Sequence, residues 1–212
     1  MVTDVQGVEV ARLRAKDARA FCVLIERLQQ PIIRYLHRLV GERDVALDLA
    51  QDTFLQVYKE IDKTSVDLSL DAWIYRIATN YGLQYLKRKR LLQFIPFSFG
   101  MTTREDETEV GEDSFTQLAA PGLSVEEQTE MHLLLQQALS HLNPRDAACL
   151  QLHYDYGFTY EQIARIVDTT PEAVRKRVAR GVSKFRAVYG KVAQPSLSTV
   201  AAVDTARSLG KR

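Results

Sequence analysis

The chain has 212 residues, with 28 Lys and Arg against 27 Asp and Glu and a formal net charge of +1. This length allows one or two domains, and 46% hydrophobic with 26% charged residues is typical of a soluble globular protein. No apolar run approaches the roughly 20 residues of a membrane span, and residues 1–16 lack the pattern of a secretory signal. We therefore expect a cytoplasmic protein in which Cys22 and Cys149 are reduced and buried.

Charge is segregated along the chain rather than absent. Residues 104–113 hold six acids against one base, whereas residues 171–191 hold seven bases against one acid. This pattern favours a DNA-binding chain. The four histidines have no metal-ligand spacing, and no phosphate loop or nucleophile–base pair is present. We therefore expect no cofactor, no metal and no enzymatic activity.

The first 90 residues are predicted to form an all-helical domain. Residues 17–29 have helical periodicity, Pro31 suits the first turn of a second helix, and Gly41 suits its end. Residues 44–61 bring apolar side chains to one side of a helix and the carboxylates of Asp44, Asp48 and Asp52 to the other. Gln51 and Leu55 project among these acids. This arrangement indicates a protein-contact surface, with an ordinary exposed leucine as the alternative.

The next predicted helix runs from about Ser69 to Arg90, with Ser69 or Asp71 as its cap. Its core side is predicted to carry Ile74, Ile77, Ala78, Tyr81 and Tyr85. Its opposite side is predicted to carry Arg76, Asn80, Gln84 and Lys87, with Trp73 at the edge. Cations, amides and an aromatic ring on one surface are typical of a nucleic-acid face, although a solvated helix with a buried tryptophan explains them equally well.

Helical periodicity fails after residue 90 and returns at a capping box beginning at Ser124. Asn143 with Pro144 is predicted to open a further helix, and Thr159 with Gln162 a short one that ends at Val167. Residues 168–170 form a turn before a last, basic helix from Pro171. Two helices joined by a tight turn, the second of them basic, form a helix-turn-helix.

The last helix is predicted to bury Val174, Val178, Val182 and Phe185. The residues that point away from this edge, toward a major groove, are Thr170, Glu172, Ala173, Lys176 and Arg180. The residues placed for phosphate contacts are Arg175, Arg177, Lys184 and Arg186. The tail from residue 190 to 212 is small and polar and is predicted to be disordered.

These pieces resemble a bacterial RNA polymerase sigma factor of the extracytoplasmic-function (ECF) type. The most specific matches to the family pattern are residues 48–55 (DLAQDTFL) and 73–80 (WIYRIATN). The resemblance implies an all-α chain of two small helical domains joined by a flexible linker. They are a sigma2-like domain at 17–90, the linker at 91–123 and a sigma4-like helix-turn-helix domain at 124–189.

The resemblance also implies partners, namely core RNA polymerase and promoter DNA, and a role for each surface. The residues that would bind the polymerase clamp helices are Asp48, Gln51, Asp52, Phe54, Leu55 and Tyr58. The residues that would melt and hold the minus-ten element are Trp73, Arg76, Asn80, Lys87 and Arg88, with the loop at 62–69. The last helix, including Arg175 and Arg177, would bind the minus-thirty-five element as duplex.

Two positions depart from the family pattern. Many members carry Asp-Ala-Glu-Asp where this chain has Val-Ala-Leu-Asp at 45–48, and Gln84 replaces an aspartate. A phosphothreonine carries about −1.5 to −2 charges, close to the two acids lost at 45–48. Activation by a Ser/Thr kinase is therefore one hypothesis, with Thr53 the favoured site and Thr64 the second. The alternative is weaker clamp binding under an anti-sigma factor.

A stand-alone helix-turn-helix regulator is the competing function. It would explain residues 124–189, but it leaves the Trp73 helix and the acidic stripe without a role.

Overall fold

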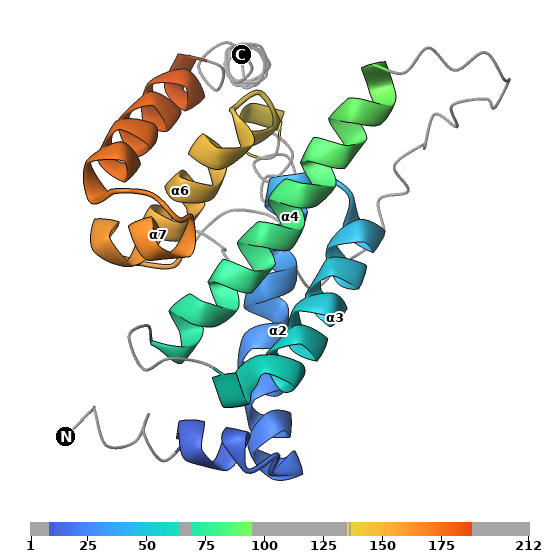
Figure 1. Ribbon diagram of the computed structural model, residues 1–212. Coiled ribbons are helices and arrows are strands. Elements are labelled where there is room, and N and C mark those ends of the chain that lie inside the picture. Colours follow the sequence, from blue (N-terminus) through green and yellow to red (C-terminus); the bar gives the residue numbers. More distant parts are fainter. Residues whose placement is uncertain (1–8, 64–68, 95–134, 136, 188–212) are drawn as a thin grey trace, which may run out of the picture.

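The computed structural model describes residues 9–63, 69–94, 135 and 137–187, and within these residues every regular element is a helix. The elements are α2 (Ala18–Val40), α3 (Arg43–Glu60), the 3₁₀ turn η1 (Ile61–Lys63), α4 (Leu70–Phe94), α6 (Pro144–Tyr154) and α7 (Tyr160–Ile166). Residues 9–14 and 171–187 are also helical. The all-α class is confirmed. The first three long helices form one bundle, and α6, α7 and the last helix form a second (Figure 1).

One continuous helix, α2, replaces the two helices predicted around Pro31, and this prediction was wrong. A proline inside a helix costs about 3 kcal/mol. The apolar stripe continues on both sides of it, however, and Leu24, Leu28, Ile32 and Leu36 are all buried. Burial of such a stripe can outweigh that cost. The two ends follow the prediction, because the Asp17 side chain caps the start and Gly41 ends the helix with φ 86°.

Helices α3 and α4 pack against α2 through the sides that the periodicity predicts. Ala46, Ala50 and Val57 of α3 and Ile74 and Ala78 of α4 are buried. The other predicted core residues of α4 are only half-buried, namely Ile77, Tyr81 and Tyr85. Gly82 lets α4 approach α2 closely, because a Cβ there would lie 2.8 Å from Cδ2 of Leu39. The three helices thus bury a core that fixes which sides of α3 and α4 face outward.

The second half is built from local capping signals. Asn143 caps α6, with Pro144 in its first turn, and Thr159 and Gln162 form a reciprocal capping box on α7. Asp168 takes φ 52° in the turn that follows, as short polar side chains allow. Cys149 in α6 is buried as expected, but Cys22 is exposed, which contradicts the prediction for that thiol.

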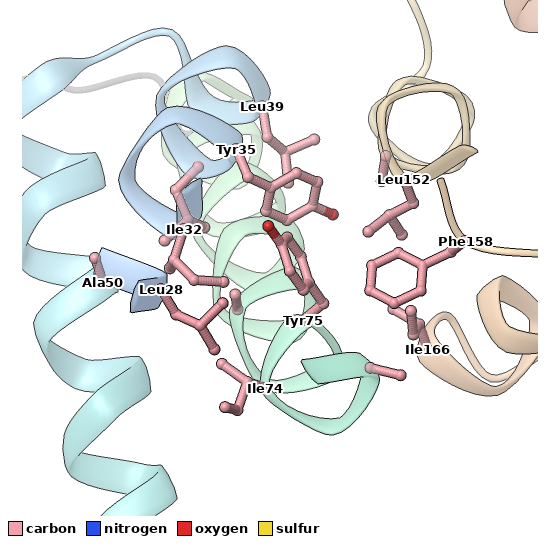
Figure 2. Packing of buried hydrophobic residues seen from close by; sticks show 14 of the residues in the cluster. Leu28, Ile32, Tyr35, Leu39, Ala50, Ile74, Tyr75, Leu152, Phe158 and Ile166 are labelled. Carbon is pink, nitrogen blue, oxygen red and sulfur yellow. The ribbon is translucent and has the colours of Figure 1, made fainter. Parts of the chain in front are cut away.

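The two halves share one hydrophobic core rather than sitting apart on a linker. Figure 2 shows Tyr75 of α4 beside Tyr35 of α2 and facing Phe158, with Leu152 and Ile166 around it. The helix α4 continues to Phe94, past the predicted boundary at residue 90. The linker from residue 95, the Ser124 capping box, Thr64 and the tail lie outside the described residues. No helix in the described part of the chain is long and apolar enough to cross a membrane.

Candidate nucleic-acid interface

An exposed stripe runs along the outer side of α3. It consists of Asp48, Gln51, Asp52, Leu55 and Tyr58, all of them exposed. Leu55 and Tyr58 are 49% and 48% exposed and lie among the carboxylates. We call these five residues the α3 stripe. Large apolar side chains ringed by acids suit a partner with a basic, partly apolar surface.

Phe54, which was predicted with this set, lies elsewhere. It is half-buried and packs against the core at the edge of the stripe. This packing against the core helps to hold α3 in place.

Lys16 is a contact of the α3 stripe that sequence reasoning missed. Its ammonium lies 4.6 Å from the ring centre of Tyr58 and donates to the Tyr58 carbonyl oxygen. It also pairs with Asp62 at 3.2 Å. Phe21 packs edge-on against the same ring, at 4.9 Å between centroids. These contacts fix Tyr58 at the end of the α3 stripe. Lys16 follows a short helix at 9–14 and takes φ 56°. Its contact with Tyr58 depends on this turn of the backbone, which no sequence motif predicts.

Thr53 lies on the core side of α3 and is fully buried. Its hydroxyl donates to the Leu49 carbonyl oxygen at 2.7 Å, one turn back along the same helix. A kinase cannot reach a side chain in this position while α3 is folded. The structure therefore contradicts Thr53 as an accessible phosphorylation site.

The outer side of α4 carries the predicted minus-ten residues. Asn80, Lys87 and Arg88 are exposed, while Trp73 and Arg76 are half-buried. Trp73 packs partly against the core, which holds its ring at the edge of the helix. The Ser69 hydroxyl accepts from the Ala72 amide at 3.3 Å, as expected of a cap. The structure thus brings amide, aromatic and cationic groups to one side of α4.

Glu42 joins the start of α3 to the end of α4. Its carboxylate accepts from Tyr85 at 2.9 Å and from Lys89 at 2.6 Å. Burial would raise the pKa of Glu42, but these hydrogen bonds lower it on balance. Burial and the hydrogen bond to Glu42 raise the pKa of Tyr85 to about 12. This link fixes the basic end of α4 relative to the α3 stripe.

The helix-turn-helix presents most of the predicted DNA residues to solvent. Thr170, Glu172, Arg175, Lys176 and Arg180 are exposed, while Ala173 and Arg177 are half-buried. The Thr170 hydroxyl accepts from the Ala173 amide at 3.2 Å and so caps the last helix. Val174 and Val178 are buried as predicted, whereas Val182 and Phe185 are only half-buried. The opposite side of the helix is therefore open to a ligand such as duplex DNA.

Two arginines of the last helix are held by neighbouring side chains. Arg180 pairs with the buried carboxylate of Asp146 in α6 at 3.0 Å. The guanidinium of Arg175 lies 5.6 Å from the ring centre of Tyr160, at an open groove of about 530 Å³. Within the described residues, no group of three or more His, Cys, Asp or Glu could hold a metal ion.

Comparison with known families decides the classification. Residues 24–91 match Sigma-70 region 2, and residues 132–185 match Sigma-70 region 4. The chain is a sigma factor of the ECF type. The two matched segments correspond to the two helical bundles.

Relatives of this sigma factor match over most of their length. It is 27% identical over 198 residues to the RNA polymerase sigma-H factor of Pseudomonas aeruginosa, covering 93% of this chain and 98% of the relative. It is 28% identical to the ECF sigma-E factor of Escherichia coli, covering 82% and 88%. It is 23% identical to the ECF sigma factor SigW of Bacillus subtilis, covering 84% and 92%.

Solved structures support the fold. The chain superposes on CnrH, solved in complex with the cytosolic domain of CnrY, with a TM-score of 0.62 and 17% identity over 88% of this chain and 97% of that one. It superposes on the Bartonella quintana sigma factor RpoE, solved with the anti-sigma factor NepR, with a TM-score of 0.57 and 21% identity over 79% and 95%.

Proposed function

We propose that this sigma factor binds core RNA polymerase through the α3 stripe and directs promoter-specific transcription initiation. The observation that carries the proposal is Leu55, which is 49% exposed on α3 among exposed acids. An apolar side chain in that setting contributes most to the free energy of binding when a partner covers it. The α3 stripe and the nucleic-acid side of α4 belong to the same bundle. A polymerase bound at the α3 stripe therefore fixes the position of the surface that we propose opens the promoter.

We assign the two promoter elements to the two halves. The outer side of α4, with Trp73, Arg76, Asn80, Lys87 and Arg88, binds the minus-ten element as a single strand. The last helix reads the minus-thirty-five element as duplex through its exposed side, while Arg175 and Arg177 contact phosphates. The exposure of Asn80, Lys87 and Lys176 supports this assignment.

Polymerase binding is tested by titrating core RNA polymerase with labelled protein. Leu55→Lys places a charge at the centre of the α3 stripe, and we expect affinity to fall at least tenfold, as for an interface hot spot. Val23→Lys is the matched control, because Val23 is exposed at 59% on α2, outside the stripe. Equal losses for both variants, or none for Leu55→Lys, would refute docking through the α3 stripe.

Control of this sigma factor by a Ser/Thr kinase stays a proposal, and Thr64 is now its candidate site. A phosphate there adds about −1.5 to −2 charges, close to the charge of the two family acids that Val45 and Leu47 replace. Control by an anti-sigma factor is the alternative. To separate the two kinds of control, the wild type and Thr64→Ala are treated with the host's Ser/Thr kinases and then titrated with core polymerase. Kinase control requires that the treatment tighten polymerase binding by the wild type and not by Thr64→Ala.

A further inference from the structure

The C-terminal part of α4 combines cations and apolar side chains in full contact with solvent. Six successive residues are exposed there, namely Lys87, Arg88, Lys89, Arg90, Leu91 and Leu92. We call these six residues the α4 tip. Each residue of a helix is turned by about 100° from the last, so six in a row point in every direction around the axis. No described element therefore covers the α4 tip, and Figure 1 shows this end of α4 extending beyond α2 and α3.

The four cations of the α4 tip form a ring around the helix axis. Lys87 to Arg90 are consecutive and so span about 300° of the helix. The Lys89 ammonium donates to the Glu42 carboxylate at 2.6 Å, and the two side chains of this pair stay 44% and 43% exposed. The sequence has no acidic residue from 72 to 103. The α4 tip is therefore basic on all sides.

The two leucines of the α4 tip lie beyond this ring of cations. Leu91 and Leu92 are 57% and 69% exposed. Each follows a cation, Lys87 or Arg88, by four residues, so it lies about 6 Å further along the axis on nearly the same side. The sequence carries no charged residue from 91 to 103, a stretch that includes three phenylalanines. The apolar groups of the α4 tip are thus farther from the bundle than its cations.

This order of groups suits the surface of a lipid bilayer. Segments that bind such surfaces place Leu and Phe at the boundary of the acyl chains and Lys and Arg among anionic headgroups. The long stems of Lys and Arg let the charge remain in the headgroup layer while the backbone moves inward. Headgroups surround an inserted helix end, so all four cations can be paired at once. A nucleic-acid strand or a protein groove would contact one side of the helix only.

We propose that the α4 tip binds the surface of membranes that contain anionic lipids, with Leu91 and Leu92 inserted and the four cations among the headgroups. Each Lys or Arg near such a surface strengthens binding roughly fivefold. Lys87 and Arg88 also belong to the surface proposed to hold the minus-ten strand, so membrane and promoter compete for this sigma factor. The competition rests on the proposed function, whereas the membrane site does not.

The first test is sedimentation of the full-length protein with phosphatidylcholine vesicles that contain or lack phosphatidylglycerol. We expect binding only to vesicles with the anionic lipid, and weaker binding at high salt. The double variant Leu91→Ser with Leu92→Ser should bind these vesicles at least about tenfold more weakly, because two leucines no longer leave water. Arg90→Glu should weaken binding at least about fivefold, because a cation becomes an anion.

Matched variants show whether these losses belong to the α4 tip. Val23→Ser with Leu47→Ser removes apolar side chains that are 59% and 39% exposed on α2 and α3. Lys59→Glu makes the change of charge at an exposed site on α3. Both controls should bind anionic vesicles like the wild type. Equal binding of the wild type to both kinds of vesicle, or an unchanged affinity in the leucine double variant, would overturn the proposal.

A second test detects insertion directly. A polarity-sensitive dye is attached at Leu92→Cys or, as the control, at Lys59→Cys, in a Cys22→Ser background. Cys149 stays in place, because it is buried and its pKa is raised to about 11. On vesicles with phosphatidylglycerol we expect the emission of the dye at position 92 to shift to shorter wavelength, and that of the dye at 59 to stay unchanged. Vesicle binding without a shift at position 92 would overturn the insertion of the α4 tip.

Transcription separates the membrane site from the proposed function. With core polymerase and limiting sigma factor, vesicles with phosphatidylglycerol should reduce run-off transcripts from a genomic promoter library. The reduction should be far smaller for the leucine double variant, each protein being compared with itself without vesicles. An equal reduction for both proteins would overturn the competition. If the vesicle results hold but the wild type gives no transcripts even without vesicles, the proposed function fails and the membrane site stands.

Discussion

Arg180 in the last helix is held by Asp146 in α6, with Nε and Nη2 of the arginine 3.3 and 3.0 Å from the two carboxylate oxygens. Asp146 is 4% exposed and cannot itself reach a ligand. The pair therefore sets the direction of a guanidinium on the side of the helix proposed to face DNA. The ion pair raises the pKa of Arg180 further above its ordinary value.

Loss of Asp146 should weaken promoter recognition through Arg180. We expect Asp146→Asn to lower the affinity of the protein for minus-thirty-five duplex by on the order of tenfold. We expect the preference for the correct base at one base pair to fall by a similar factor, because a free guanidinium samples other orientations. Arg180→Lys should give the same loss of discrimination, since a lysine lacks the fork that a bidentate contact needs. Binding titrations on single-base substitutions check this. Equal weakening on every sequence would show a phosphate contact instead.

Burial of Thr53 makes its replacements informative. Thr53→Val should shift the melting temperature by only a few degrees, because the hydroxyl bonds only within its own helix. Thr53→Glu, which imitates a phosphate, should unfold the first bundle, because it places an unpaired charge in the core. Thermal denaturation by circular dichroism measures both. If Thr53→Glu melted like the wild type, the assignment of Thr53 to the core would be wrong.

A buried hydroxyl pair joins α2 to α4. Tyr35 Oη and Thr79 Oγ1 lie 2.7 Å apart, and both residues are fully buried. Burial raises the pKa of Tyr35 far above its ordinary value, so it remains a neutral phenol. Thr79→Val should cost about 1–3 kcal/mol, because it leaves the phenol without a partner. Adding Tyr35→Phe should recover part of this loss in urea unfolding. Purely additive losses would contradict the coupling.

The Glu42 link predicts a dependence of stability on pH. Its folded pKa is lowered, so the ionised carboxylate stabilises the fold above the unfolded pKa, about 4.3. That contribution is lost as pH falls through the folded pKa. The side chain is 43% exposed, so we expect less than about 1 kcal/mol. Glu42→Gln should be less stable than wild type at pH 7, with the difference shrinking below pH 4. A constant difference across this range would contradict the assignment.

Features with local causes could be predicted from the sequence. The caps at Asn143, Thr159 and Gly41 each depend on a side chain or a glycine within three residues of the helix end. The burial of Thr53 also followed from periodicity, since it lies on the core side with Ala50 and Val57. A family motif alone does not show this, because it fixes the residue type at position 53 and not the direction of its side chain.

Features that depend on distant residues could not be predicted. Arg38 of α2 and Asp155, which pair at 2.7 Å, are 117 positions apart, and nothing local to either marks the partner. Lys16 meets Tyr58 only because the chain turns back at φ 56° before α2. The helical continuity through Pro31 is likewise a tertiary effect, since burial on both sides overrides a local helix breaker.

Run-off transcription with purified core polymerase on a genomic promoter library tests the central claim most directly. The account predicts transcripts that share a pair of upstream elements, present with the wild type and Val23→Lys and lost with Leu55→Lys. No transcripts with the wild type, together with tight binding of duplex DNA in the absence of polymerase, would contradict it and identify a stand-alone regulator.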